Sequence, residues 1–287
     1  MKVLILGGGY TGLRLGRWLA GQGISVCLTN RQGKPLRELA LPVFPFAYTP
    51  MGDARPLPIE ALAGVTHVLS TIPPDAQGVD PVAVSLLDRL QGQKLTWFGY
   101  LSTTGIYGDT QGAWVDETAP YNPQNARSQH RVTAETQFLQ SSLPTHIFRL
   151  PGIYGPGRSI FDRLQAGAVQ HVVKPGHVFS RVHVDDIVQT LGRSIQNPQP
   201  GTIYNVADDE PTESSVLLIE ACRLLGIDPP PPLSFDPEQM SPMAASFWQE
   251  CRRVSNHKIK TELGVNLCYP TYREGLKAIL NGLCFCA

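Results

Sequence analysis

The sequence has no excess of charge of either sign and no long apolar run. Its 24 Lys and Arg residues balance 24 Asp and Glu residues, which gives a formal net charge of +0 at pH 7. This balance offers no electrostatic reason to bind nucleic acid or an anionic membrane. No apolar run reaches the ~18 residues of a spanning helix, and no signal-peptide pattern precedes the first apolar run. We therefore expect a cytoplasmic protein that binds neither nucleic acid nor membranes.

Motifs for metal binding and for hydrolysis are also missing. The six cysteines form no C-x-x-C pair, and no set of His, Cys and carboxylate residues has the spacing of metal ligands. No G-x-S-x-G sequence, the setting of the nucleophilic serine in one large class of hydrolases, occurs either. The sequence therefore predicts no metal site.

The first 28 residues contain the most informative pattern. Residues 3–6 are an apolar run typical of a strand buried on both faces of a parallel sheet. Three glycines follow in a G-x-G-x-x-G pattern, and residues 13–20 repeat apolar side chains at the period of a helix. A second apolar run occupies residues 24–28. The glycines therefore lie between a strand and a helix of a βαβ unit.

Each glycine has a physical reason in a turn that binds a dinucleotide. Gly7 permits a tight turn, Gly9 lets a pyrophosphate approach the backbone, and Gly12 lets the helix pack close to the strand. The helix N-terminus then offers free N–H groups and its positive dipole end to the phosphates. We predict a dinucleotide site at Gly7, Gly9, Tyr10, Thr11 and Gly12. The alternative is a glycine-rich turn without a ligand.

The end of the second strand bears on which dinucleotide binds. A carboxylate at this place usually holds the adenosine ribose 2′-hydroxyl, but the sequence has Asn30 and Arg31 there, with Lys34 and Arg37 nearby. A guanidinium suits a 2′-phosphate, which it can bind through two hydrogen bonds. We therefore predict a preference for NADP(H), with NAD(H) as the other candidate. These charges could also belong to a solvated loop.

Beyond residue 30, apolar runs alternate with helical patterns. The alternation predicts an α/β fold with a Rossmann-like, doubly wound parallel sheet and a smaller C-terminal lobe that binds substrate. Ligands bind beyond the carboxyl ends of the strands in such sheets. We therefore expect further cofactor contacts from the loops that follow three strands, at Thr71, Ile72, Pro73, Ser102, Pro151, Gly152 and Ile153.

The same patterns suggest two domains. We expect a dinucleotide-binding domain over residues 1–150, completed by residues 178–210. Residues 151–177 and 211–287 are expected to form the smaller substrate-binding lobe.

Several stretches, in order, resemble the extended short-chain dehydrogenase/reductases, the NAD-dependent epimerase/dehydratase family. Besides the glycine pattern they are residues 101–108 (LSTTGIYG), 115–120 (VDETAP), 149–157 (RLPGIYGPG), 181–187 (RVHVDDI) and 204–207 (YNVA). Residues 253–256 (RVSN) and 269–275 (YPTYREG) resemble an atypical, YeeZ-like branch of the family.

The resemblance implies a chemistry that this sequence carries only in part. In the family a Ser or Thr polarises the substrate oxygen, a Tyr is the general acid or base, and a Lys four residues later lowers the pKa of that Tyr. The Ser/Thr position falls on Thr103, whereas the Tyr and Lys positions fall on Arg127 and Arg131. A guanidinium keeps its proton near neutral pH, so neither arginine can exchange one. We expect Arg131 to contact the cofactor, and Arg127 either the substrate or only solvent.

By analogy with the family, other tyrosines and arginines are candidates for the missing acid or for substrate contacts. Tyr107 is our candidate for the missing acid, although packing beneath its loop is the alternative. Tyr154, Arg158 and Arg181 are expected at the substrate, because family members hold nucleotide-sugar phosphates near the two arginine positions. Arg158 and Arg181 could equally form structural ion pairs.

His183 and two adjacent carboxylates look like a catalytic cluster at first sight. We expect instead that Asp185 caps a helix and that Asp186 makes a structural hydrogen bond.

Two functions remain open. The first is an NAD(P)-binding oxidoreductase or epimerase-like enzyme with a small polar, nucleotide-sugar-like substrate, and with Thr103 and Tyr107 as the catalytic candidates. The second is a non-catalytic NADP(H)-binding sensor or scaffold, which the loss of the Tyr and Lys suggests. The resemblance further implies a homodimer.

Overall fold

The computed structural model describes residues 1–35, 40–49 and 54–282, which form two compact units. Unit 1 comprises residues 1–106, 125–149 and 188–204. Unit 2 comprises residues 107–124, residues 150–187 and the chain from residue 205 onward. The expected division into a dinucleotide-binding domain and a substrate-binding lobe stays a prediction.

Unit 1 is built on a seven-stranded sheet in the order β12-β7-β5-β4-β1-β2-β3. Neighbouring strands from β3 through β2, β1 and β4 to β5 pair in parallel. The expected α/β fold with a Rossmann-like parallel sheet is confirmed. The strands are β1 (Lys2–Leu6), β2 (Ser25–Asn30), β3 (Val43–Pro45), β4 (His67–Ser70), β5 (Trp97–Thr103), β7 (Thr145–Leu150) and β12 (Thr202–Asn205).

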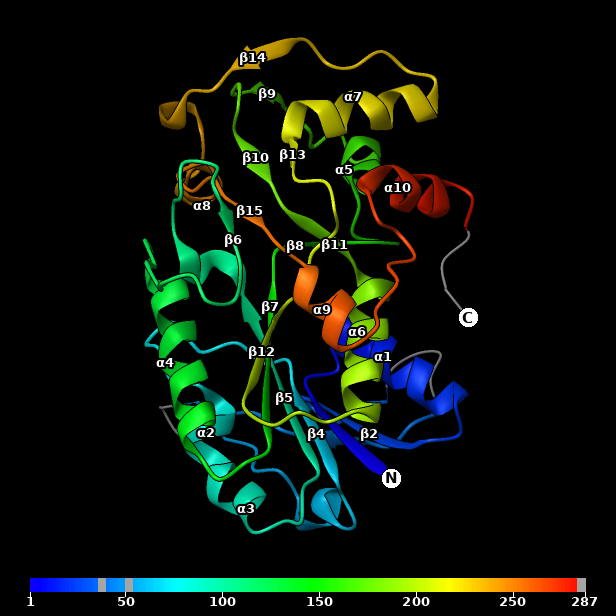
Figure 1. Cartoon of the computed structure of the whole chain (residues 1–287). Helices are drawn as coiled ribbons and strands as arrows, with labels where there is room; N and C mark the ends of the chain where they lie inside the picture. The colour runs from blue at the N-terminus through cyan, green and yellow to red at the C-terminus, as the bar shows by residue number, and fades with distance from the viewer. Residues whose placement is uncertain (36–39, 50–53, 283–287) are drawn as a thin grey trace. The chain divides into compact units, whose positions relative to one another are not determined.

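Helices cover both faces of this sheet (Figure 1). One face carries α1 (Tyr10–Gly21) and the part of α6 (Val184–Gln196) from residue 188 on, and Gly192 of α6 lies directly against the Trp18 ring of α1. The other face carries α2 (Pro81–Ser85), α3 (Leu87–Gln91) and α4 (Ala126–Gln140). Short 3-10 turns occur at η1 (Ile59–Leu62) and η2 (Thr104–Tyr107). The sheet is therefore doubly wound.

The core on the second face explains why these segments fold together. Strand residues Leu4, Leu6 and Phe98 pack with Ala134 and Phe138 of α4, and all are buried. The Phe138 ring lies 4.9 Å from that of Phe98, a distance typical of favourable aromatic pairs. The apolar run after Met1 is therefore buried on both sides, as its composition indicates.

Two elements differ from the sequence expectation. The helix expected over residues 80–90 is two helices, because Leu86 has a φ of −125° that ends α2 while its side chain stays buried in the core. Strand β5 extends two residues beyond Leu101, so that Thr103 is its last residue.

Unit 2 contains four two-stranded sheets and several short helices. β10 and β13 are antiparallel, whereas β8 and β11, β9 and β14, and β6 and β15 are parallel. A buried cluster of Tyr154, Ala221, Tyr272 and Leu276 joins β8, α7 and α10. The elements are β6 (Trp114–Val115), β8 (Gly152–Tyr154), α5 (Ile160–Gln165), β9 (His171–Val173), β10 (Val178–Phe179), β11 (Arg181–His183), β13 (Thr212–Glu213), α7 (Ser214–Leu225), β14 (Pro232–Ser234), η3 (Pro237–Gln239), α8 (Pro242–Phe247), β15 (Arg253–Val254), α9 (His257–Glu262) and α10 (Tyr272–Leu280).

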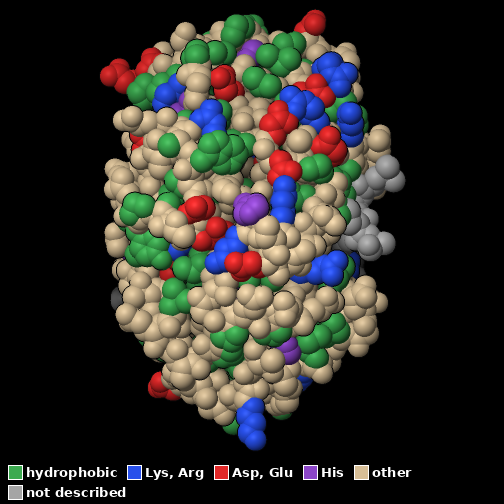
Figure 2. Space-filling view, in the orientation of Figure 1, with side chains coloured by type: hydrophobic (Ala, Val, Ile, Leu, Met, Phe, Trp, Pro, Cys, Tyr) green, Lys and Arg blue, Asp and Glu red, His purple; other side chains and the backbone are tan. Residues whose placement is uncertain are grey.

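Within the described ranges, no helix is both long and apolar enough to cross a membrane. On the face shown in Figure 2, basic and acidic side chains are interspersed. This mixture agrees with the balanced charge of the sequence.

A buried ion pair fixes α4 against strand β7. The Arg149 Nη2 atom lies 2.8 Å from Glu135 Oε2, its Nε donates to both carboxylate oxygens at 3.3 Å, and both side chains are 0% exposed. Removing one partner of such a pair leaves a buried charge uncompensated.

We expect Glu135→Gln to lower the free energy of unfolding by about 3 kcal/mol, since the Arg149 charge stays buried. Urea denaturation of the full chain measures this loss. The control is Glu220→Gln, which breaks the Glu220–Arg223 pair where Arg223 is 62% exposed. The control should cost under ~1 kcal/mol, and equal losses in the two variants would contradict the interpretation.

Candidate functional site

The turn after β1 has the geometry that its glycines predict. Gly7 has a φ of +101°, and a Cβ there would lie 2.4 Å from the Thr71 hydroxyl oxygen, so only glycine fits. A Cβ on Gly12 would lie 2.2 Å from the Gly7 carbonyl oxygen. Helix α1 therefore packs directly on the turn, and glycine at both positions is a steric requirement.

Two threonines hold this turn from the neighbouring strands. The Gly7 N–H donates to the Thr29 hydroxyl at 2.9 Å, and the Gly8 N–H donates to the Thr29 carbonyl at 2.6 Å. From the other side, the Thr71 hydroxyl donates to the Gly7 carbonyl at 2.9 Å. The turn is thus fixed by β2 on one side and by the end of β4 on the other.

The N-terminus of α1 is arranged to receive an anion. Gly9 is its N-cap residue and offers no side chain to the first N–H groups of the helix. Gly9 is exposed, and a Cβ placed on it would meet no protein atom within 4 Å. The open space at Gly9, its lack of a side chain and the helix dipole together fit a pyrophosphate. Tyr10 and Thr11 form the first turn of this helix.

At the end of β2, the two predicted residues have different surroundings. Asn30 Oδ1 accepts from the N–H groups of Gln32 and Lys34, and its Nδ2 donates to the Lys34 carbonyl. The Asn30 side chain therefore closes its own turn. Arg31 follows on the exposed surface of that turn. Arg37 lies outside the described residues.

The loop after β4 lies beside the glycine turn. A Cβ on Gly7 would lie 3.1 Å from Ile72 Cγ1, and Ile72 also packs against the core of unit 1. Pro73 is exposed at the next position. Unit 1 therefore brings the loop over residues 71–73 to the edge of the sheet that carries the glycine turn.

The end of β5 supplies Ser102 and Thr103. Ser102 is buried, and its hydroxyl has no hydrogen-bond partner among the described residues. Thr103 is half-buried, and its hydroxyl oxygen accepts from the Gly105 N–H at 3.1 Å. The Thr103 hydroxyl can therefore donate a hydrogen bond to a ligand.

Helix α4 places the two arginines differently. Arg127 is exposed, whereas Arg131 is half-buried and lies against β5. Arg131 Nη1 donates to the Tyr100 hydroxyl at 3.0 Å and to the Leu101 carbonyl at 2.5 Å. Burial raises the pKa of Tyr100 above its usual value despite the adjacent guanidinium, so this phenol is no base. Arg131 thus keeps a fixed positive charge near the end of β5.

Sequence reasoning missed Ser128, which is one of the buried residues of α4, as is Glu135. A Cβ on Gly105 would lie 2.5 Å from the Ser128 hydroxyl oxygen. Helical spacing alone held no signal for Ser128, because Arg127 and Ser128 both lie within the same ~100° arc of the helix as Arg131.

Tyr107 belongs to unit 2 and has a structural partner. It is 1% exposed, and its hydroxyl donates to Asn205 Oδ1 at 2.7 Å. The same asparagine donates its backbone N–H to Glu117 at 2.7 Å. This geometry favours packing beneath the loop over the acid–base role that we assigned to Tyr107.

The loop after β7 also belongs to unit 2. Pro151 and Ile153 are half-buried, and Gly152 is exposed. Arg158 is exposed and closes a turn with Gly155 through backbone hydrogen bonds.

Tyr154 of β8 and Arg181 of β11 lie within the packed part of unit 2. Tyr154 is buried under α10, where a Cβ on Gly275 would lie 2.2 Å from its hydroxyl oxygen. Burial raises the pKa of Tyr154 well above its usual value. Arg181 Nη1 donates to the carbonyl groups of Phe179 and Thr212, so one guanidinium nitrogen supports the β10–β13 pair.

The carboxylates that follow His183 make structural contacts, but only one of the two makes the contact that we expected. Asp186 accepts hydrogen bonds from the N–H groups of Cys268 at 2.7 Å and Tyr269 at 3.2 Å, as expected. The expectation that Asp185 caps the helix is wrong, because α6 already begins at Val184 and Asp185 lies in its first turn. The Asp185 N–H instead lies 3.2 Å from His183 Nδ1.

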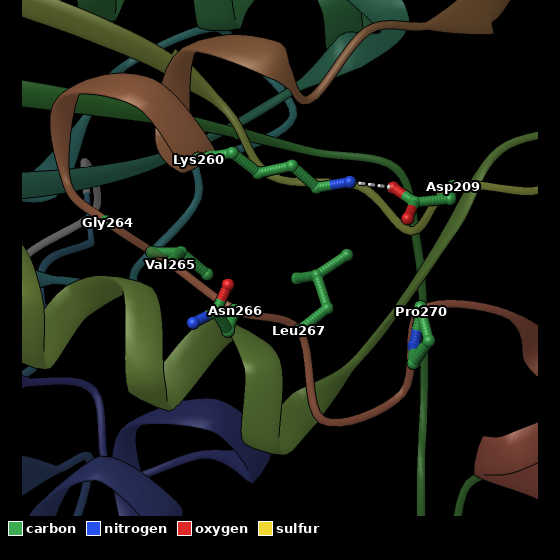
Figure 3. Close-up of a pocket in the computed structure, with 7 residues that line it drawn as sticks. All are labelled: Asp209, Lys260, Gly264, Val265, Asn266, Leu267 and Pro270. Carbon is green, nitrogen blue, oxygen red and sulfur yellow. Dashed lines mark hydrogen bonds and ion pairs between the residues drawn. The ribbon is translucent and has the colours of Figure 1, made fainter.

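A pocket of about 400 Å³ occurs elsewhere in unit 2, around α9 and the loop that follows it (Figure 3). Lys260 and Asp209 point toward each other at its rim, 2.5 Å apart. Asp209 also accepts from Asn256 Nδ2 at 2.6 Å. The two charged residues that line the pocket are thus paired with each other. None of the predicted site residues lines the pocket. The lining residues are Asp209, Lys260, Gly264, Val265, Asn266, Leu267 and Pro270.

Asp208 is an unusual carboxyl group in unit 2. It is 1% exposed, and burial raises its pKa to about 8 although the nearby Arg181 opposes the shift. The folded protein therefore holds this proton up to about pH 8, whereas the unfolded chain releases it near pH 4. The unfolded state binds fewer protons in this interval, so the contribution of Asp208 lowers stability as the pH rises.

We expect Asp208→Asn to remove this contribution. The free energy of unfolding of the variant minus that of the wild type should rise between about pH 4 and pH 8 and level off outside that range. Urea denaturation at a series of pH values measures the difference. Asp116→Asn is the control, because the exposed Asp116 carboxyl has a lowered pKa and should give a flat difference above about pH 5. A flat difference for Asp208→Asn would show that this group ionises normally.

Comparison with known proteins gives relatives along most of the chain. The chain is 28% identical over 240 residues to Protein YeeZ of Escherichia coli (strain K12), which covers 80% of this chain and 85% of YeeZ. It is 44% identical to a conserved protein of unknown function from Silicibacter pomeroyi DSS, with a TM-score of 0.89 and 98% of each chain covered.

More distant structures share the fold. MoeE5 in complex with UDP-glucuronic acid and NAD is 17% identical, with a TM-score of 0.79 and 98% of each chain covered. The human epimerase family protein SDR39U1 with NADPH is 16% identical, with a TM-score of 0.75 and coverage of 99% of this chain and 100% of that one. The model of the NAD dependent epimerase/dehydratase family matches residues 3–207, well over half of the sequence. The chain therefore belongs to the NAD dependent epimerase/dehydratase family.

Proposed function

We propose that this protein is an NADP(H)-binding oxidoreductase or epimerase-like enzyme. The observation that carries the proposal is the glycine turn, where the exposed N-cap residue Gly9 has no side chain and borders open space at the positive end of α1. The same sheet edge carries Arg31, the loop after β4 and Thr103, in the order that a bound dinucleotide requires.

The preference for the phosphorylated cofactor rests on Arg31. An exposed guanidinium after β2, with no carboxylate at the strand end, suits a 2′-phosphate. The turn that Asn30 closes through three hydrogen bonds fixes the backbone from which Arg31 extends. MoeE5 is in complex with NAD and SDR39U1 with NADPH on a similar fold, so the proposed preference rests on the charge at this turn and not on the fold.

Nicotinamide cofactors supply hydride transfer, and the chain supplies binding and orientation. Thr103 would donate a hydrogen bond from its hydroxyl to the substrate oxygen that gains negative charge. Arg131, fixed by Tyr100 and Leu101, would add positive charge at that edge and contact the cofactor. Because neither arginine of α4 can exchange a proton, water would carry the proton to or from the reacting oxygen.

The substrate class follows from the family fold and from unit 2. MoeE5 binds UDP-glucuronic acid, and we propose a small polar or nucleotide-linked substrate for this chain. Unit 2 would be the substrate-binding lobe, with Arg158 offering an exposed guanidinium to a phosphate. Tyr154 and Arg181 would support that lobe from within. We further propose that the protein acts in the cytoplasm as a homodimer.

A second candidate function is a sensor that binds NADP(H) without turnover. The exposed Arg127 at the position of the family's Tyr favours it, because no acid–base group replaces the phenol at that place. Cofactor binding is common to both candidates, whereas a role of Thr103 in turnover belongs to the enzyme alone.

The cofactor preference predicts an effect of Arg31→Ala. We expect the Kd for NADPH to rise roughly tenfold or more, as for loss of a charge-assisted hydrogen bond, and the Kd for NADH to stay within about twofold. Calorimetric titration of both cofactors measures this. Arg193→Ala, which also removes one exposed positive charge of unit 1, should change neither Kd. Tight NADH with weak NADPH in the wild type would overturn the preference, and binding of neither would overturn both candidate functions.

The enzyme proposal predicts the effect of Thr103→Val, which keeps the shape of the side chain and removes its hydroxyl. A substrate screen with NADPH and NADP⁺, including UDP-glucuronic acid and UDP-glucose, first identifies a turnover reaction. The variant should lose roughly 10²-fold or more in kcat with nearly unchanged cofactor affinity. Turnover that survives would reject Thr103 as the oxygen ligand. A wild type that binds NADPH but turns over no substrate of the panel would favour the sensor.

A further inference from the structure

Two hydroxyl groups from different elements meet at Gly105. A Cβ on Gly105 would lie 2.5 Å from the Ser128 hydroxyl oxygen and 3.3 Å from that of Thr103. Thr103 ends β5, and Ser128 lies in the first turn of α4. The two distances, 2.5 Å and 3.3 Å, add to 5.8 Å, so the two hydroxyl oxygens are at most that far apart, a separation that one ligand oxygen about 2.9 Å from each can bridge.

The Ser128 hydroxyl is available, unlike other hydroxyls of α4. Thr133 and Thr136 donate to the carbonyl groups four residues before them, as helical Ser and Thr commonly do. The residue four positions before Ser128 precedes the helix, so no helical carbonyl stands there. Within the described part of the chain, the Ser128 hydroxyl makes no hydrogen bond, and Thr103 uses only an acceptor position.

The electrostatic surroundings favour a ligand oxygen with negative charge. Asn125 caps α4 and binds the Ser128 N–H at 3.0 Å, which orients the first turn and its positive dipole end. Arg131 follows three residues later on the same face and is held to Leu101 of β5. A positive helix end and a fixed guanidinium therefore flank the two hydroxyls.

We propose that Thr103 and Ser128 together donate hydrogen bonds to one oxygen of the substrate, a carbonyl or alkoxide oxygen on the reacting carbon. This inference rests on the proposed function. In the family a Tyr on this helix makes this hydrogen bond. Ser128, the buried residue directly after Arg127, would make it here. An alkyl hydroxyl is a far weaker acid than a phenol, so Ser128 would stabilise charge without giving up its proton.

Gly105 is part of this arrangement. Any side chain there would occupy the space between the two hydroxyls. The absence of a Cβ at position 105 therefore lets the Ser128 hydroxyl lie close to the end of β5.

A crystal structure of the full chain at high resolution tests the geometry with water as the probe. We expect one ordered water within about 3.2 Å of both hydroxyl oxygens, present in the wild type and lost in Ser128→Ala. Thr133→Ala, which removes an exposed hydroxyl from the same helix, is the matched control and should keep the water. A Ser128 hydroxyl that instead bonds a protein carbonyl would overturn the proposal, as would a shared water that persists in Ser128→Ala.

Kinetics and stability give independent readouts. With a substrate found in the screen, Ser128→Ala should lower kcat roughly 10²-fold and leave the Kd for NADPH within about twofold. Gly105→Ala should lower Tm, and adding Ser128→Ala should restore it, because the new methyl group would then have room. An unchanged kcat in Ser128→Ala, or no restoration of Tm, would contradict the inference. Absence of NADPH binding would overturn the proposed function, while the shared water can still be sought in crystals without cofactor.

Discussion

The approach of α1 to the turn after β1 is the constraint on which the site of unit 1 depends. A Cβ on Gly12 would lie 2.2 Å from the Gly7 carbonyl oxygen, so the first turn of the helix stands directly over the backbone of the turn. Thr29 and Thr71 fix that backbone from β2 and from the end of β4. Because the turn is held from both sides, the N-terminus of α1 has a fixed place, and an anion bound there would require little ordering of the protein.

The remaining parts of the site follow from the parallel sheet. Strands β2, β1, β4 and β5 are neighbours, so the residues at their carboxyl ends meet along one edge. Arg31, the turn at Gly7, the loop at Thr71 and the hydroxyl of Thr103 therefore share an edge although the sequence separates them. The helix that packs on β5 then contributes Ser128 and Arg131 to the end of that strand.

How much of this could be predicted from the sequence depends on the range of the interaction. The glycine turn is a local motif whose reason lies in backbone sterics, and it was predicted with the roles that Gly7 and Gly12 have. Thr29, which holds the turn, has no local signal, since its hydroxyl acts on a residue twenty-two positions earlier. The cap assigned to Asp185 was wrong by two residues, because α6 starts at Val184 directly after strand β11. The hydrogen-bond partner of Tyr107 is Asn205, ninety-eight residues away, and no pattern in the sequence predicts this contact.

Arg127 and Arg131, to which the resemblance assigns the family's Tyr and Lys positions, have different surroundings. At position 131 the longer guanidinium reaches Tyr100 and Leu101, so the positive charge remains at the end of β5 in a fixed place. At position 127 the side chain is exposed, and the buried neighbour of that position is Ser128. Under our proposal, the helix would keep the positive charge of the family's pair and would offer a hydroxyl that does not titrate near neutral pH in place of a phenol. Such a site would stabilise charge on an oxygen, and water would supply the proton.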